Sequence, residues 1–235
     1  RIHLRDGCVV GRPSFPHSCS VATTNVAGRL VNVTQSTFAA IGEGLGLAEG
    51  GCAVGAGYAV VSGKDFRRGG QPYINQLFAS LNGGPGGPKA DGWASYAGPQ
   101  SPGSSYRDSV ELDEIKHPVL IKSLRLVPGT GGAGRYRGAP PSEITFGPRR
   151  DTMTAVIISD CNHFAPKGVR GGHDGVLANA FLVDDDGHEQ KLANVVQLEL
   201  RPGQWIRGHE SSGGGYGSPR EREPERVRND VLEGW

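Results

Sequence analysis

The sequence has 235 residues, enough for one large domain or two small ones with a substantial core. Its 25 basic and 24 acidic residues leave a formal net charge of +1, which gives no general attraction to nucleic acid or to anionic membranes. No apolar run approaches the ~18 residues of a membrane span, and no secretory signal is recognisable. Glycine accounts for 38 residues, more than twice the usual share of about 7%. This composition predicts many turns joining short strands.

The cysteines indicate the redox compartment of the protein, and the first residue indicates whether the chain is a fragment. Four cysteines are spread along the sequence: Cys8, Cys19, Cys52 and Cys161. They form no CxxC pair, so we expect reduced thiols in a cytoplasmic protein rather than a metal cluster or a disulfide framework. The chain starts at Arg1 and its single methionine is Met153. Because an initiator methionine is normally kept before arginine, we expect the chain to be a fragment or a proteolytic product.

The first hundred residues predict one helix and two strands. Residues 1–16 are typical of a short strand and a turn. Apolar residues near helical spacing predict an amphipathic helix from about 20 to 41, ended by Gly42. Strands are expected at 58–62 and 73–81, with a glycine pair in the loop between them.

Residues 82–93 contain so many glycines and prolines that a loop is the expected structure. The loop ends on Asp91 and Trp93, and an aspartate and an indole at the end of a long loop suit a substrate-facing edge. A turn at Asp91 with Trp93 as a packing anchor explains the same residues equally well. Both interpretations stay open.

Residues 109–114 follow a polar link and alternate between apolar and acidic side chains. On an extended chain this pattern places Glu111 and Asp113 on one face. Paired carboxylates are suited to acid–base chemistry or to holding a metal ion. A solvated acidic face is the commoner explanation of such a pair.

The stretch 128–138 carries five glycines and two arginines after an apolar run. Gly131 and Gly132 permit close approach of another backbone or of a ligand. Arg135 and Arg137 are two residues apart and would share one face of a strand. Local chemistry alone favours a glycine-rich turn with a basic edge over a phosphate-binding loop.

The remainder of the chain predicts short strands separated by turns. Strands are expected near 143–146, 153–159, 178–183, 195–200 and 204–207, with a hairpin turn at 184–187. A short amphipathic helix is expected at 224–233, with proline at its start and Gly234 after its end. The predicted fold class is therefore α+β: a glycine-rich, mostly antiparallel β assembly with one long N-terminal and one short C-terminal helix. We expect a helix-and-strand part at 1–104 and a β-rich part at 105–235.

Two further sites deserve a chemical interpretation. The glycine loops at 166–175 and 211–217, which include Gly171, Gly172 and Gly214, are able to present backbone amides to an anion. Cys161 and His163 lie two apart, which would let a thiol and its base share one face. A buried structural thiol is the favoured explanation of Cys161.

The order of these motifs resembles the C-terminal part of the hydantoinase B/oxoprolinase family. The matching pieces are Asp91-Gly-Trp93, Glu111–Glu114 with His117-Pro118, the glycine stretch 129–138, the glycine loops 166–175 and 213–217, and the closing helix with Asp230 and Gly234. The resemblance covers about two thirds of the chain. One departure is Arg107, where the family pattern has asparagine.

This resemblance implies a function in a multi-subunit enzyme. Such subunits act with a hydantoinase A-type, ATP-binding subunit and open cyclic amides such as hydantoins, 5-oxoproline and lactams, while relatives carboxylate ketones. It places ATP and magnesium on the partner subunit and a divalent metal such as zinc, manganese or iron on the family's N-terminal half, supplied by a companion polypeptide. No metal ligands are expected in this chain itself. It also implies a hetero-oligomer with a small-molecule substrate, and no nucleic acid or membrane partner.

Three functional hypotheses remain: part of an ATP-dependent cyclic-amide hydrolase, the same part of an ATP-dependent ketone carboxylase, and a non-catalytic scaffold piece of such a complex. The candidate catalytic residues are Asp91, Glu111 and His163. The candidate substrate-binding residues are Trp93, Gly131, Gly132, Arg135, Gly171, Gly172, Gly214 and Tyr216.

Overall fold

The computed structural model describes residues 3–8, 10–12, 14–17, 24–51, 55–94, 96 and 107–235, with the backbone alone at 24 and 25. Its helices are α1 (Thr24–Ile41), α2 (Val110–Lys116) and α3 (Pro224–Glu233). Its strands are β1 (Val60–Asp65), β2 (Gln71–Gln76), β3 (Val119–Leu126), β4 (Ser142–Pro148), β5 (Met153–Ile158), β6 (Asn179–Val183), β7 (Glu189–Lys191), β8 (Val195–Leu200) and β9 (Trp205–His209). The predicted α+β class is confirmed. Start residues 20–23 of the predicted first helix lie outside the described residues.

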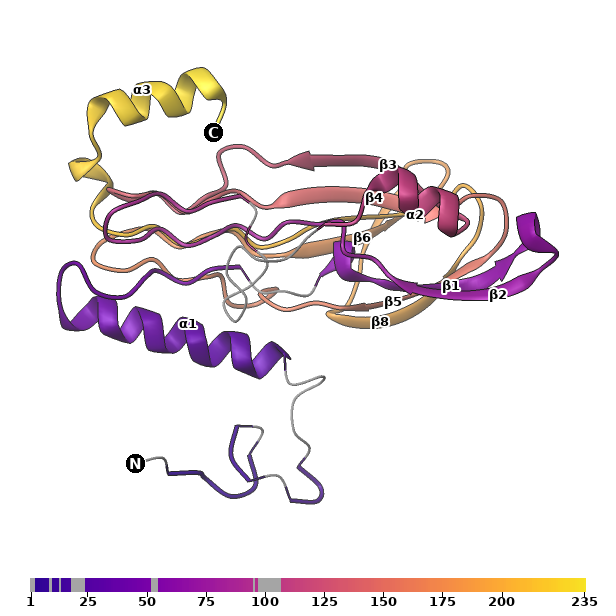
Figure 1. The fold of residues 1–235 in the computed structure, drawn as a ribbon, viewed down its shortest axis with the longest axis horizontal. Coiled ribbons are helices and arrows are strands. Elements are labelled where there is room, and N and C mark those ends of the chain that lie inside the picture. Colours follow the sequence, from indigo (N-terminus) through magenta and orange to yellow (C-terminus); the bar gives the residue numbers. More distant parts are fainter. Residues whose placement is uncertain are drawn as a thin grey trace.

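The strands form two sheets that pack face to face. One sheet has the order β2-β1-β5-β8 and the other β3-β4-β9-β6-β7, and the strand pairs are antiparallel. The strand expected at 153–159 is present as β5, and its alternate residues are buried, as in a strand with one face towards the core. Val61, Met153 and Ile157 from the first sheet share one core with Ile144, Phe146 and Ile206 from the second. Figure 1 shows this sandwich at one end of the molecule.

The expected division at residue 104 remains a prediction about domain organisation. β1 and β2 precede it and β5 and β8 follow it, yet the four strands form one sheet. This shared sheet is an argument against two separately folding parts.

Five glycine-rich segments make up the other half of the molecule: 47–51, 82–93, 129–140, 166–176 and 211–217. We call them the glycine layer. They run side by side and exchange backbone hydrogen bonds, such as Gly83 N to Ser211 O (3.0 Å) and Gly86 N to Gly214 O (2.9 Å). The predicted loop at 82–93 indeed lacks helix and strand, but residues 82–87 are buried inside this layer rather than exposed on the surface.

Glycine is required here because the backbones approach too closely for a side chain. A Cβ atom on Gly213 would lie 1.9 Å from the carbonyl oxygen of Gly84, and one on Gly172 would lie 2.1 Å from that of Gly215. The same steric rule places glycine at the axis of the collagen triple helix. The layer lies between α1 and α3 (Figure 1).

Each covering helix is attached by specific contacts. The side-chain amide of Asn32, buried on the inner face of α1, donates to the carbonyl of Gly50 (2.9 Å) and accepts from its amide (3.1 Å). α3 begins with Pro224 and ends at Gly234, whose φ of 73° is left-handed, as the sequence predicts.

Three sequence predictions are wrong: the extended structure of residues 109–114, the end of the second strand, and the short strand near the start of the chain. Residues 109–114 are not extended, because Ser109 caps the N-terminus of α2: its Oγ accepts from the amide of Leu112 (3.4 Å). The second strand ends at Gln76 instead of continuing to residue 81. Within the described part of 1–17, two isolated bridges at Asp6–Arg12 and Ser14–His17 replace the expected short strand.

Candidate functional site

Asp91, at the end of segment 82–93, anchors the C-terminal part of the chain. Its carboxylate accepts from the backbone amide of Arg137 (2.8 Å) and from both terminal nitrogens of Arg222 (2.7 and 3.0 Å). Arg226 of α3 adds a contact of 3.2 Å. Partial burial alone would raise the pKa of Asp91, but the hydrogen bonds and charge of Arg222 outweigh it and lower that pKa. Asp91 is thus an ionised anchor, and its catalytic role stays a prediction.

Trp93 lies at the same edge with 39% of its surface exposed. Its ring meets that of Tyr96 edge-on, with the ring centroids 5.4 Å apart. Its backbone carbonyl accepts from Gly84 (3.1 Å). The packed side of the Trp93 ring agrees with a packing anchor, and the exposed side is accessible to a substrate. Both interpretations of Trp93 therefore stand.

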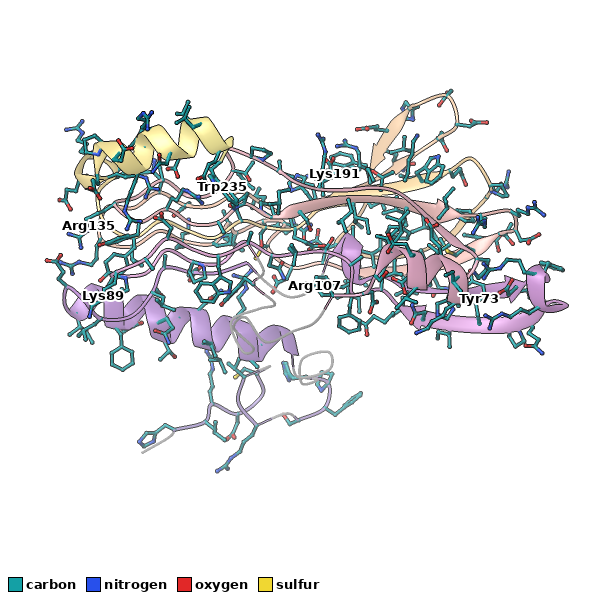
Figure 2. All side chains as sticks on the ribbon, turned by 45° about the horizontal axis from the view of Figure 1, so that its top comes forward. Tyr73, Lys89, Arg107, Arg135, Lys191 and Trp235 are labelled. Atoms are coloured by element: carbon teal, nitrogen blue, oxygen red, sulfur yellow. The ribbon has the colours of Figure 1, made fainter. Side chains whose placement is uncertain are left out.

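Arg135 and Arg137 do not form the common basic edge that an extended chain would give them. Arg135 pairs with Glu43 after α1 (2.8 Å) and with Glu221 (3.6 Å). Arg137 pairs with Asp230 of α3 (3.0 Å). Figure 2 shows Arg135 at the end of the glycine layer. The irregular glycine-rich backbone turns the two side chains to different partners.

A cavity of about 240 Å³ lies between the stretch 129–138 and α3. Gly131 and Arg137 line it on one side, and Val227 and Trp235 on the other. The guanidinium of Arg137 lies 4.7 Å from the centre of the Trp235 ring, a cation–π distance. Gly131 thus has access to an open space, whereas Gly132 does not line this cavity.

The other predicted glycines are explained by close packing. Cβ atoms on Gly132 and Gly214 would lie 2.4 and 2.3 Å from carbonyl oxygens of His173 and Lys167. Gly171 has a left-handed φ of 86°. Tyr216 is fully buried, and its hydroxyl donates to the carbonyl of Leu45 (3.1 Å). Their substrate-binding role stays a prediction, as does that of Arg135.

The two carboxylates of α2 have different environments, because a helix turns them away from one another. Glu111 is exposed and accepts from Ser109 Oγ (2.5 Å), which lowers its pKa. Asp113 is buried beside Asn75 (3.4 Å), and burial raises the pKa of Asp113 to about 6. They do not form the expected carboxylate pair, and Glu111 as a catalytic residue stays a prediction.

Cys161 is buried and lies next to a charged pair. Arg29 of α1 donates to Asp160 through two nitrogens (3.2 and 3.1 Å) and to the Cys161 sulfur (2.9 Å). Cys161 has a left-handed φ of 59°, and its amide donates to Asp160 (2.8 Å). His163 is exposed, so the expected alignment with the thiol is replaced by contact with a guanidinium. A catalytic role of His163 stays a prediction.

Sequence reasoning missed the buried acid Glu210, which follows β9. Its side chain has no exposed surface, and Oε1 accepts from the amide of Gly57 (3.0 Å). Burial raises the pKa of Glu210 to about 7, although the Gly57 amide favours the charged form. The available signal was weak: a single acid directly before the glycine run 211–217.

We expect the stability of the protein to depend on this acid in the pH range 5 to 8. The folded state raises the pKa of Glu210 from 4.5 to about 7, so its stabilising effect is complete below pH 4.5 and is lost as the pH rises through about 7. Relative to Glu210→Gln, the wild-type protein should lose up to about 3 kcal/mol over this range. Thermal unfolding of the purified protein at several pH values measures the difference. The exposed Glu225→Gln serves as control, and parallel pH curves for wild type and Glu210→Gln would contradict the expectation.

A metal site does not fit the described part of the chain. Among those residues, no group of three or more histidine, cysteine, aspartate or glutamate side chains is placed to hold an ion. Cys8 is partly exposed and Cys161 is buried, while Cys19 and Cys52 lie outside the described residues. In the same part of the chain, no helix has the length and hydropathy that crossing a membrane requires.

Two solved structures share the fold of this chain. The ATP-dependent caprolactamase from Pseudomonas jessenii has this fold, with a TM-score of 0.80 over 96% of this chain and 39% of that chain at 23% identity. An acetone carboxylase in its nucleotide-free state aligns with a TM-score of 0.56 over 80% of this chain and 29% of that chain at 15% identity.

Sequence comparison identifies the family. The family model described as hydantoinase B/oxoprolinase matches residues 1–219, and the chain belongs to this family. It is 30% identical to the caprolactamase subunit beta of Pseudomonas jessenii over 74% of this chain and 31% of that protein. It is 29% identical to the 5-oxoprolinase of Saccharomyces cerevisiae over 46% of this chain and 8% of that protein. The chain thus spans less than a third of the length of these relatives.

Proposed function

We propose that this chain is part of the hydantoinase B-type subunit of an ATP-dependent cyclic-amide hydrolase. The likeness to the caprolactamase subunit beta carries the proposal, because it extends over 74% of the chain at 30% identity. The fold likeness to the caprolactamase structure supports it independently of sequence. The substrate is a hydantoin, a 5-oxoproline or a lactam.

The catalytic machinery of the proposed complex is divided between polypeptides. A hydantoinase A-type subunit binds ATP and magnesium, and the remaining part of the family fold holds a divalent metal such as zinc, manganese or iron. ATP supplies the driving force by phosphorylating a poor electrophile, which gives it a leaving group.

In this arrangement the glycine layer gives the site a rigid support. Its backbones are fixed by mutual hydrogen bonds, and the Asp91–Arg222–Asp230 ion pairs fix α3 to its outer face. A rigid support holds groups that bind substrate in a productive position.

Two alternatives rest on specific observations. The fold likeness to acetone carboxylase favours the same part of an ATP-dependent ketone carboxylase. The structural contacts of Asp91 and of the predicted glycines favour a non-catalytic scaffold piece. Each alternative predicts a different pattern of turnover.

A substrate screen of the reconstituted complex decides between them. Phosphate release from ATP is measured with lactams, hydantoins and 5-oxoproline, and separately with ketones plus bicarbonate. We expect ATP turnover together with a ring-opened amino acid from one cyclic amide. Turnover only with ketone and bicarbonate would establish the carboxylase instead. Full activity of a complex assembled without this chain would show that the chain is a dispensable scaffold.

A further inference from the structure

A cavity of about 300 Å³ lies at the end of the β-sandwich that points away from the glycine layer. It is formed by the helical turn Phe66–Arg68 after β1, the start of β3, and the turn between β4 and β5. Figure 1 shows the β1–β2 hairpin at this end of the molecule. Three arginines line the cavity, Arg67, Arg149 and Arg150, and we call it the arginine cavity. None of the site residues predicted from the sequence lines it.

Two of the three arginines are unpaired. Arg149 and Arg150 are exposed, and neither side chain has an ion pair or a hydrogen bond among the described residues. Arg67 is engaged: its guanidinium donates to both carboxylate oxygens of Asp65 (2.9 Å each) and to the backbone carbonyl of Glu114 (2.7 Å). Arg149 and Arg150 therefore retain donors for a ligand.

The acids in the lining do not cancel these two charges. Asp65 is buried and already paired with Arg67 (2.9 Å) and Arg68 (3.8 Å). Asp151 also lines the cavity, but within the described structure no ion pair joins it to an arginine. One acid thus stands against the two unpaired arginines.

The residue before the cavity's Pro118 lies in the same positive field. Burial and then the charges of Arg68, Lys116 and Arg67 lower the pKa of His117. The whole chain has a formal net charge of only +1. The positive potential is therefore a local property of this end of the molecule, where it attracts anions.

One wall of the cavity is aromatic. Phe66 lines it and has 61% of its surface exposed. The ring packs over the backbone of the same turn, since a Cβ atom on Gly70 would lie 3.7 Å from Phe66 Cε1. An exposed aromatic face beside cationic groups suits a planar ring, because aromatic rings stack on one another.

These features define the class of ligand. Arginine binds carboxylates and phosphates through its fork of N–H donors. Two unpaired guanidinium groups favour a phosphate, whose terminal oxygens are able to accept from both. The volume lies at the lower end of the range for small-molecule sites, roughly 300–1,000 Å³, so the ligand is small.

We propose that the arginine cavity binds a small organic phosphate with a planar ring, such as a nucleoside monophosphate. The phosphate accepts from Arg149 and Arg150, and the ring packs on Phe66. This site is additional to the ATP site proposed for the partner subunit. It does not depend on the reaction that the complex catalyses.

The test measures binding of adenosine monophosphate, phenyl phosphate and inorganic phosphate by calorimetry. It uses the full subunit that contains this chain, purified without the ATP-binding subunit, so that the proposed ATP site does not contribute. Both ring-bearing phosphates should bind at least about fivefold more tightly than inorganic phosphate, the effect of one ring stacked on an aromatic side chain. Phe66→Ala should remove this difference.

Charge variants test the phosphate contacts. Arg150→Gln should weaken binding of every phosphate by roughly tenfold or more, the effect of one hydrogen bond between charged groups. Asp151→Asn should strengthen it, because the like charge of the carboxylate repels the ligand. The matched control is Arg228→Gln on α3, at the other end of the molecule, and it should leave the three affinities unchanged.

Thermal unfolding first verifies that each variant is folded, as expected for side chains at the surface. Absence of binding of all three phosphates by the wild type would overturn the inference. So would equal affinity for inorganic phosphate and the ring-bearing phosphates, or equal affinities of the wild type and a folded Arg150→Gln subunit. None of these outcomes affects the proposed function, which is tested by ATP turnover with cyclic amides.

Discussion

Replacement of Gly213 by alanine should prevent the chain from folding. The new Cβ would lie 1.9 Å from the oxygen and 2.4 Å from the carbon of the Gly84 carbonyl, and 2.9 Å from Pro85 N. These are backbone atoms, so no side-chain rotation relieves the overlap. Moving the segment away would break the hydrogen bonds of Gly213 with Ala139 (3.1 Å) and Gly132 (2.9 Å). We expect a loss of more than about 4 kcal/mol, most of the stability of an ordinary domain.

Gly42→Ala is the matched control for this substitution. Its nearest neighbouring atom would be Leu45 Cδ1 at 3.4 Å, and its φ is not left-handed. Alanine there should be neutral or stabilise by about 0.4–1 kcal/mol through the unfolded state. Soluble yield, circular dichroism and thermal unfolding compare the two variants. A Gly213→Ala protein that melts within a few degrees of the wild type would show that the layer tolerates a side chain.

The sequence predicted those helices, strands and turns that are determined by residues close together in the chain. The apolar run of β5, the hairpin turn at 184–187 and the proline and glycine at the ends of α3 each act within a few residues. α2 was missed because a short alternation was given more weight than the capping hydroxyl of Ser109. The signal that favoured the helix was Ser109, which directly precedes α2 and caps the amide of Leu112.

Long-range packing explains what the sequence could not predict. The glycine count predicted turns, but the layer depends on contacts between segments such as Gly84 and Gly213, which are far apart in the chain. Asp91 was a candidate catalytic residue, but the sequence did not indicate its partner Arg222, which is also distant in the chain. Glu210 has no local feature that marks burial, since the amide of Gly57 reaches it only in the folded protein.

Substitution of Val33 by aspartate should disrupt assembly of the hydantoinase B-type subunit. The outer face of α1 is apolar and exposed, with Leu30, Val33, Phe38 and Ile41 between 50% and 70% accessible. α1 has a single charged residue, Arg29, and it pairs with Asp160 near the sheets. Such a face suits an obligate interface of about 2,000 Å² or more. We propose that the part of the family fold outside these 235 residues covers it.

An unpaired carboxylate buried in that interface should weaken association by at least tenfold, because it would lose its water without gaining a partner. Val231→Asp is the control, since Val231 is 76% exposed on the polar helix α3. Size-exclusion chromatography with multi-angle scattering compares the two variants after co-expression with the remaining part of the subunit. We expect the Val33→Asp chain to elute apart from its companion and the Val231→Asp chain to elute with it. Equal assembly of both variants would mean that the outer face of α1 faces water in the working enzyme.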